Sequence, residues 1–150
     1  MAQKVFKTMV SLENYIEKAC EKAVENACNR LLGTLQELIM SEYYDESVYQ
    51  PTGQYKRTFQ FYKSAMTEML SKTCGQIFMN TDTMDYPFSG RGWSWDGATQ
   101  IYEANQGIHG GWSTSESRQH RYWNEFEEYC DKHAIKILQE ELKKQGIKTV

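Results

Sequence analysis

The chain lacks a long apolar run, a cluster of basic residues and a closely spaced pair of cysteines. Nothing in its 150 residues approaches the roughly 20 apolar residues of a membrane-spanning helix. Residues 1–10 lack the apolar core of a signal peptide, so we expect a protein that folds in a cytoplasm and does not contact membranes. The formal net charge is −3 without any basic tract, which argues against tight binding of nucleic acid.

Residues that could carry metal or phosphate chemistry are few and scattered. Zinc sites need about four nitrogen or sulfur ligands at close spacing, whereas Cys130 and His133 form the one such pair here. The glycines at 90 and 92 are not followed by the Lys-Ser/Thr of a phosphate-binding loop. The sequence therefore predicts reduced thiols, no metal and no cofactor; the cysteines are Cys20, Cys28, Cys74 and Cys130.

Two alternative functions remain open from the residues alone. His109 lies in a glycine-rich stretch, and with Asp82, Asp85 or Asp96 it would form the site of a small enzyme. A loop histidine that hydrogen-bonds the backbone is the simpler interpretation, so we expect no catalytic residue. The second alternative is a binding module that holds a peptide or sugar through its tryptophans.

What the chain does have is the composition of one globular domain, spanning residues 1–150. Hydrophobic residues make up 40% and charged residues 25%, which is ordinary for such a domain. Aromatic residues reach 13%, with ten Tyr and four Trp, and this favours a surface that packs against another molecule.

Apolar residues recur at steps of three and four in two long segments, which predicts a helix at each end of the chain. The first runs over residues 12–39, with Ser11 as its cap and residues 1–10 as a lead-in. Its strip of small residues would let another element approach closely; these are Ala19, Ala23 and Ala27. The second begins near Gln119 and ends before Gly146.

The middle of the chain predicts short strands and loops. Pro51, Thr52 and Gly53 indicate a turn, after which residues 55–62 favour a short helix leading into a strand. Residues 65–71 and 74–81 are typical of two antiparallel strands, with a turn at 72–73. Residues 82–113 form a loop rich in Gly and Trp, with a short helix between Asp96 and Gly107. The sequence thus predicts an α+β fold: a long N-terminal helix, a small antiparallel sheet, this loop and a C-terminal helix.

A family resemblance lies at the end of the first helix. Tyr43-Tyr44, Tyr49-Gln50-Pro51 and Tyr55-Lys56-Arg57-Thr58 together resemble the signature of head–tail joining proteins of long-tailed phages, also called minor capsid or tail-completion proteins. In that family a long helix precedes a Pro, a turn and a Tyr/Leu-x-Arg-Thr/Ser segment. Asn105 to Gly110 is similar to the family's Gly-x-His-Gly element. The chain departs from the pattern at Thr52-Gly53, which are extra, and in its Trp-rich loop.

The resemblance implies a structural virion protein of the phage neck, made in the cytoplasm of a bacterial host. It would form a ring, of six or twelve copies, that joins the DNA-filled head to the tail. The implied neighbours are portal-adaptor or head-closure proteins on one side and tail-terminator or tail-tube proteins on the other, with genome DNA passing through without sequence-specific binding. The residues expected to make contacts are Tyr49, Pro51, Tyr55, Arg57, Thr58, Trp93, Trp95, His109 and Trp112.

We expect Arg57 to anchor the turn after Pro51, because a guanidinium among aromatic rings can stack on a ring while it donates to backbone carbonyls. Arg57→Ala should then lower the free energy of unfolding by about 1–3 kcal/mol. Thermal denaturation measures this effect. A melting temperature equal to that of the wild type would show that Arg57 is merely solvated.

Overall fold

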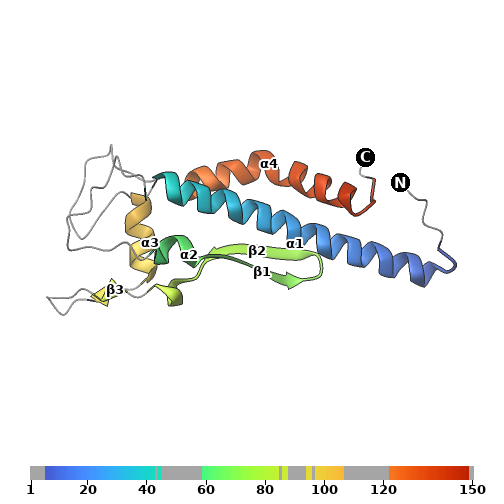
Figure 1. Cartoon of the computed structure of the whole chain (residues 1–150), viewed down its shortest axis with the longest axis horizontal. Coiled ribbons are helices and arrows are strands. Elements are labelled where there is room, and N and C mark those ends of the chain that lie inside the picture. The colour runs from blue at the N-terminus through green and yellow to red at the C-terminus, as the bar shows by residue number, and fades with distance from the viewer. Residues whose placement is uncertain are drawn as a thin grey trace.

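The protein is an α+β structure in which a long helix carries a second helix and a β-hairpin (Figure 1). The computed structural model describes residues 6–42, 44, 59–84, 86–87, 94–95, 97–106 and 122–148. Its elements are α1 (Met9–Glu42), α2 (Gln60–Ser64), β1 (Ala65–Ser71), β2 (Cys74–Met79), the 3-10 helix η1 (Thr81–Thr83), β3 (Tyr86–Pro87), β4 (Ser94–Trp95), α3 (Gly97–Gln106) and α4 (Tyr122–Lys144).

Helix α1 begins earlier than the sequence predicts, and its cap is Thr8 rather than Ser11. The Ser11 amide donates to Thr8 Oγ1 at 3.2 Å, and the Thr8 amide donates to Ser11 Oγ at 3.3 Å. This reciprocal pair satisfies amides at the helix start in the manner of a capping box, so Met9 and Val10 belong to the helix rather than to a lead-in. The helix has 34 residues and is therefore about 51 Å long.

Helix α1 is the middle layer of the fold. Both α4 and the β1–β2 hairpin pack on it, and Figure 1 shows them on opposite sides of it. The predicted small-residue strip is buried along α1, as a close approach of other elements requires; its members are Ala19, Ala23 and Ala27. A helix covered on two sides buries residues on more than one of its faces.

The β1–β2 hairpin confirms the predicted antiparallel pair and its turn. Ala65 pairs with Met79 and Met69 with Gly75, with a bulge next to the turn at 72–73. Strand β2 ends at Met79 rather than at residue 81, because the side chain of Asn80 accepts a hydrogen bond from the Asp82 amide and starts η1. The short helix predicted within residues 55–62 corresponds in part to α2, which begins at Gln60 and ends at Ser64; residues 55–58 lie outside the described residues.

Helix α2 starts from a strained residue. Phe59 has φ 55°, in the left-handed region that favours glycine. Its ring stacks on Tyr44, with ring centroids 4.9 Å apart. This contact links the segment before α2 to the residues that follow α1, and it helps to hold a conformation that a phenylalanine rarely adopts.

The segment rich in Gly and Trp contains an element that the sequence did not predict. Strands β3 and β4 pair there as a two-residue antiparallel ribbon, with Tyr86 opposite Trp95. Helix α3 occupies the range expected for the short helix, and it contacts η1. The expected cap of α3, Asp96, lies outside the described residues, as do residues 119–121 before α4.

The core lies where α2 and the start of α4 pack against the C-terminal half of α1. Phe61 and Tyr122 are both fully buried and pack edge to face, with ring centroids 5.2 Å apart. Edge-to-face packing of two aromatic rings is favourable beyond the area that it buries. The residues around this pair come from the C-terminal half of α1 and the inner face of α4; they include Leu31, Leu35, Ile39, Phe126 and Ile137.

The C-terminal end of α4 is closed by a Schellman motif. The Gly146 amide donates to the Lys143 carbonyl at 3.0 Å, and the Ile147 amide donates to the Leu142 carbonyl at 3.0 Å. Gly146 has φ 85°, and Tyr15 of α1 donates its hydroxyl to the Gln145 carbonyl at 2.6 Å. A Cβ on Gly146 would lie 2.9 Å from that hydroxyl. The turn thus both ends α4 and fixes it to the N-terminal part of α1.

We expect Gly146→Ala to lower the free energy of unfolding by about 1 kcal/mol or more, because alanine resists a positive φ and would crowd Tyr15. Gly33→Ala is the matched control: Gly33 lies within α1 and a Cβ there would have no atom within 4 Å. The control should stabilise the protein by about 0.5–1 kcal/mol through better helix propensity. Urea denaturation of both variants measures the difference, and equal effects would contradict it.

Candidate interaction surface

Most of the contact residues predicted from the sequence lie outside the residues that the structure describes. Eight of the nine lie outside them, and for Trp95 the backbone alone is placed, in β4. Their roles therefore stay predictions; the eight are Tyr49, Pro51, Tyr55, Arg57, Thr58, Trp93, His109 and Trp112. The candidate surface must be sought among the exposed side chains of the described elements.

The β1–β2 hairpin presents one face to solvent. Cross-strand partners point to the same side of a sheet, and Met66 pairs with Phe78 and Glu68 with Gln76. Together with Leu70, these four residues form what we call the outer face of the hairpin. Leu70 is 58% exposed, Met66 is also exposed, and the Gln76 amide donates to the Glu68 carboxylate. A two-stranded sheet with apolar side chains on its open face is marginal alone, so this face is suited to contact another surface.

Helix α4 presents a second exposed surface, on the other side of the molecule. Ile135 is 75% exposed, the highest exposure among the large apolar residues described. The exposed residues before it are mostly acidic and those around and after it are mostly basic. We call the following set the outer face of α4: Glu125, Glu128, Asp131, Lys132, Ile135 and Lys136. One ion pair lies within it, between Lys132 and Glu128 at 3.1 Å.

A buried carboxylate lies between α1 and α4. Glu141 is 2% exposed, and its carboxylate accepts from Arg30 at 2.9 Å and from Lys144 at 2.6 Å. Asn26 donates to the same group at 3.4 Å, and Arg30 also pairs with Glu140. The hydrogen bond from Lys144 and those from Arg30 and Asn26 lower the pKa of Glu141 despite its burial. A carboxylate satisfied in this way is fixed rather than poised for proton transfer, so we interpret the cluster as the lock between the two helices.

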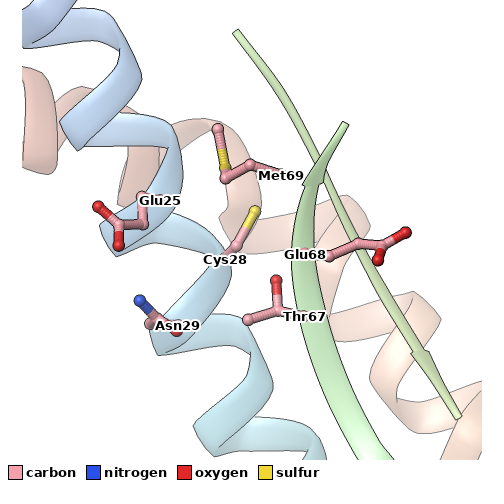
Figure 2. Close-up of a pocket in the computed structure, with 6 residues that line it drawn as sticks. All are labelled: Glu25, Cys28, Asn29, Thr67, Glu68 and Met69. Carbon is pink, nitrogen blue, oxygen red and sulfur yellow. The ribbon is translucent and has the colours of Figure 1, made fainter. Parts of the chain in front are cut away.

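A shallow pocket lies between α1 and β1 (Figure 2). Its lining is Glu25, Cys28, Asn29, Thr67, Glu68 and Met69. Figure 2 shows Thr67 and Met69 pointing toward α1, whereas Glu68 points away, onto the outer face of the hairpin. A Cβ on Gly75 would lie 2.6 Å from Cys28 Sγ, so the hairpin approaches α1 this closely because residue 75 is glycine.

Two of the cysteine thiols, Cys28 and Cys130, are held in their protonated form by burial. All four cysteines are free. Burial is the largest influence on Cys28 and Cys130, and it raises the pKa of both thiols. Because the thiolate is the reactive form, neither thiol is activated for nucleophilic attack.

The other sequence candidates for chemistry are also dispersed. The described residues contain no group of three or more His, Cys, Asp or Glu side chains that could hold a metal. His133 was expected on the apolar face of its helix, but it is exposed and its ring contacts that of Tyr129. Asp82 is exposed in η1, and its proposed companions Asp85, Asp96 and His109 lie outside the described residues.

Within the described ranges, no helix combines the length and the apolar character needed to cross a membrane. Searches against protein-family models, curated proteins and solved structures found no match. The surfaces described above must therefore be interpreted on their own geometry.

The exposed residues of both outer faces were missed in the sequence, although a signal for each was present. Alternation within 65–71 places Met66, Glu68 and Leu70 on one side of a strand, opposite Thr67 and Met69. Ile135 falls outside the apolar stripe of α4, which contains Ala134, Ile137 and Leu138. An apolar residue out of phase with its helix is a candidate contact residue rather than a core residue.

We expect Glu141→Gln to lower the free energy of unfolding by about 1–2 kcal/mol at pH 7, since it removes the charge that Arg30 and Lys144 bind. The folded-state pKa of Glu141 lies below its ordinary value, so ionised Glu141 stabilises the fold above that ordinary pKa. This contribution is lost as the pH falls through the folded-state pKa.

Urea denaturation across pH measures this contribution. The difference between the wild type and Glu141→Gln should be largest near neutral pH and should shrink in acid. Glu128→Gln is the control, because Glu128 makes one exposed ion pair and should change stability by less than about 0.5 kcal/mol. A pH-independent difference for Glu141→Gln would contradict the assignment.

Proposed function

We propose that this chain is a structural protein of a phage neck, which assembles as a ring between the DNA-filled head and the tail. The observation that carries the proposal is that the two elements packed on opposite sides of α1 each expose an apolar side chain, Leu70 on the hairpin and Ile135 on α4. Apolar contacts on two opposite sides suit a molecule with a like neighbour on each side, and repetition of such a head-to-tail contact closes a ring when the rotation permits.

The shape of the described elements is in keeping with this role. Helix α1 is longer than a core of this size requires, and the elements packed along it form a flat body of three layers. Flat bodies stand side by side around an axis with little empty space between them. Two features of the resemblance, a long helix early in the chain and a C-terminal helix, have counterparts in α1 and α4.

The work of such a protein is binding rather than turnover. Burial raises the pKa of the Cys28 and Cys130 thiols, and the buried carboxylate of Glu141 is paired with Arg30 and Lys144, which is in keeping with side chains that serve packing. The ring would contact portal-adaptor or head-closure proteins and tail-terminator or tail-tube proteins at its two rims. DNA would pass through its channel without sequence-specific contacts, in keeping with the net charge of −3.

The test is to locate the protein in particles released by a strain that carries its gene. Mass spectrometry of purified particles should find the chain in several copies, and electron microscopy with a labelled chain should place six- or twelvefold density between head and tail. The gene should also lie between capsid and tail genes. Absence of the chain from the particles, or its presence in single copies, would refute the proposal.

A further inference from the structure

Two sulfur atoms lie close together in the pocket between α1 and β1. Figure 2 shows Cys28 extending from α1 toward the hairpin and Met69 extending from β1 toward α1. A Cβ on Gly75 would lie 2.6 Å from Cys28 Sγ and 3.2 Å from Met69 Sδ. The two sulfurs are therefore no farther apart than these two distances added together. Packing of the hairpin on α1 thus brings a thiol and a thioether to one place.

Gly75 is what allows both sulfurs to approach the strand. It pairs with Met69 in the β1–β2 ladder, and cross-strand partners point to the same side of a sheet. A side chain at residue 75 would therefore occupy the space that the two sulfurs border. The pocket beside them has a volume of about 240 Å³, which is ample room for an ion.

The oxygen ligands of the pocket are engaged elsewhere. The Glu25 carboxylate pairs with Lys22 at 2.7 Å, and the Glu68 carboxylate accepts from Gln76 and points away from α1. The Thr67 hydroxyl donates to the Gln76 carbonyl at 2.8 Å. The two sulfurs are therefore the ligands that this pocket offers most directly.

Such a pair of ligands selects a soft ion. Thiolate and thioether sulfur suit Cu(I), whereas Mg²⁺ and Ca²⁺ prefer oxygen and structural zinc takes about four nitrogen, sulfur or carboxylate ligands. The described residues contain no group of three His, Cys, Asp or Glu side chains that could complete a zinc site here.

The spacing of the sulfurs also suits Cu(I), which is satisfied by two ligands in line. A metal–thiolate bond is about 2.3 Å long, so such an ion holds its two sulfurs about 4.6 Å apart. This separation lies within the limit set by the distances to Gly75. The side chain of methionine has three rotatable bonds and can adjust its sulfur to the ion.

We propose that Cys28 and Met69 bind one Cu(I) ion between α1 and the hairpin. On binding, the Cys28 thiol releases its proton to water and its sulfur becomes the thiolate ligand, while Met69 supplies a lone pair of its thioether. Copper keeps its oxidation state, and the ion ties β1 to α1. The proposal differs from the expectation of no metal, which rested on the ligands of zinc, and it does not depend on the proposed neck function.

Competition with a chelator tests whether Cys28 binds the ion. The other three cysteines of the full-length chain are changed to serine, so that Cys28 is its one thiol; these are Cys20, Cys74 and Cys130. The protein is titrated without oxygen against the coloured complex of Cu(I) with bicinchoninate. We expect it to take up one Cu(I) ion per chain, and Cys28→Ser in this background should abolish the uptake. No uptake by the single-thiol protein, or equal uptake after Cys28→Ser, would overturn the inference.

A pair of methionine variants in the same background tests the second ligand. Met69→Leu keeps the apolar volume and should weaken Cu(I) binding by at least about tenfold, since it removes a ligand. Met66→Leu is the matched control, because Met66 is exposed on the outer face of the hairpin, and it should leave the affinity unchanged. Equal affinities of the two variants would overturn the assignment of Met69. Circular dichroism checks that each variant is folded.

Thermal denaturation of the native chain gives a readout that does not depend on the serine substitutions. Cu(I) should raise the melting temperature, because the fold alone brings the two sulfurs together. The rise should be smaller in Met69→Leu than in Met66→Leu, and an equal rise in both would overturn the inference. Both measurements use the isolated protein, so their failure leaves the neck function standing. Absence of the chain from phage particles, in turn, leaves the copper site standing.

Discussion

The structure depends on the burial of two faces of one helix. Helix α1 packs against α4 on one side and against the β1–β2 hairpin on the other, and neither of these elements would be stable without it. A two-stranded hairpin is marginal alone in water, and a helix gains most of its stability from the packing of its apolar stripe. Small residues along α1 bring the layers close, and Gly75 does the same for the hairpin at Cys28.

Polar contacts then fix the position of each layer along α1. Apolar packing alone permits a helix to slide by a turn, whereas a buried carboxylate must keep its partners. Glu141 meets this condition with Arg30 and Asn26, and Tyr15 holds the last turn of α4. On the other side, the Lys72–Glu17 ion pair holds the turn of the hairpin. These contacts set the positions of the hairpin and of α4 along α1.

The proposed assembly follows from what this arrangement leaves uncovered. A three-layer stack covers both sides of its middle layer and leaves one side of each outer layer open. In this chain each open side carries an apolar residue with charged neighbours, a combination that gives affinity from the apolar contact and specificity from the charges. A ring would cover both sides with copies of the same chain, and no separate partner is needed for that step.

The sequence by itself determined the main elements, α1, the hairpin, α3 and α4, because their signals are local. Apolar periodicity predicted α1 and α4, and alternation around Lys72-Thr73 predicted the hairpin with β1 at its observed bounds. It misplaced the start of α1, since the capping pair of Thr8 and Ser11 is recognised by the hydrogen bonds between them. It also placed His133 on the apolar face of α4, whereas the structure leaves this residue exposed. Periodicity identifies the apolar stripe of a helix but not how far along the helix other elements cover that stripe.

The tertiary structure alone decided how these elements face one another. The sequence gives no direct sign that the hairpin and α4 take opposite sides of α1, or that Glu141 is buried beside Arg30, which is more than a hundred residues away along the chain. Such contacts depend on loop closure and packing between distant segments, which local patterns do not record. For the same reason the sides of α1 on which the elements carrying Leu70 and Ile135 lie were decided by the tertiary structure.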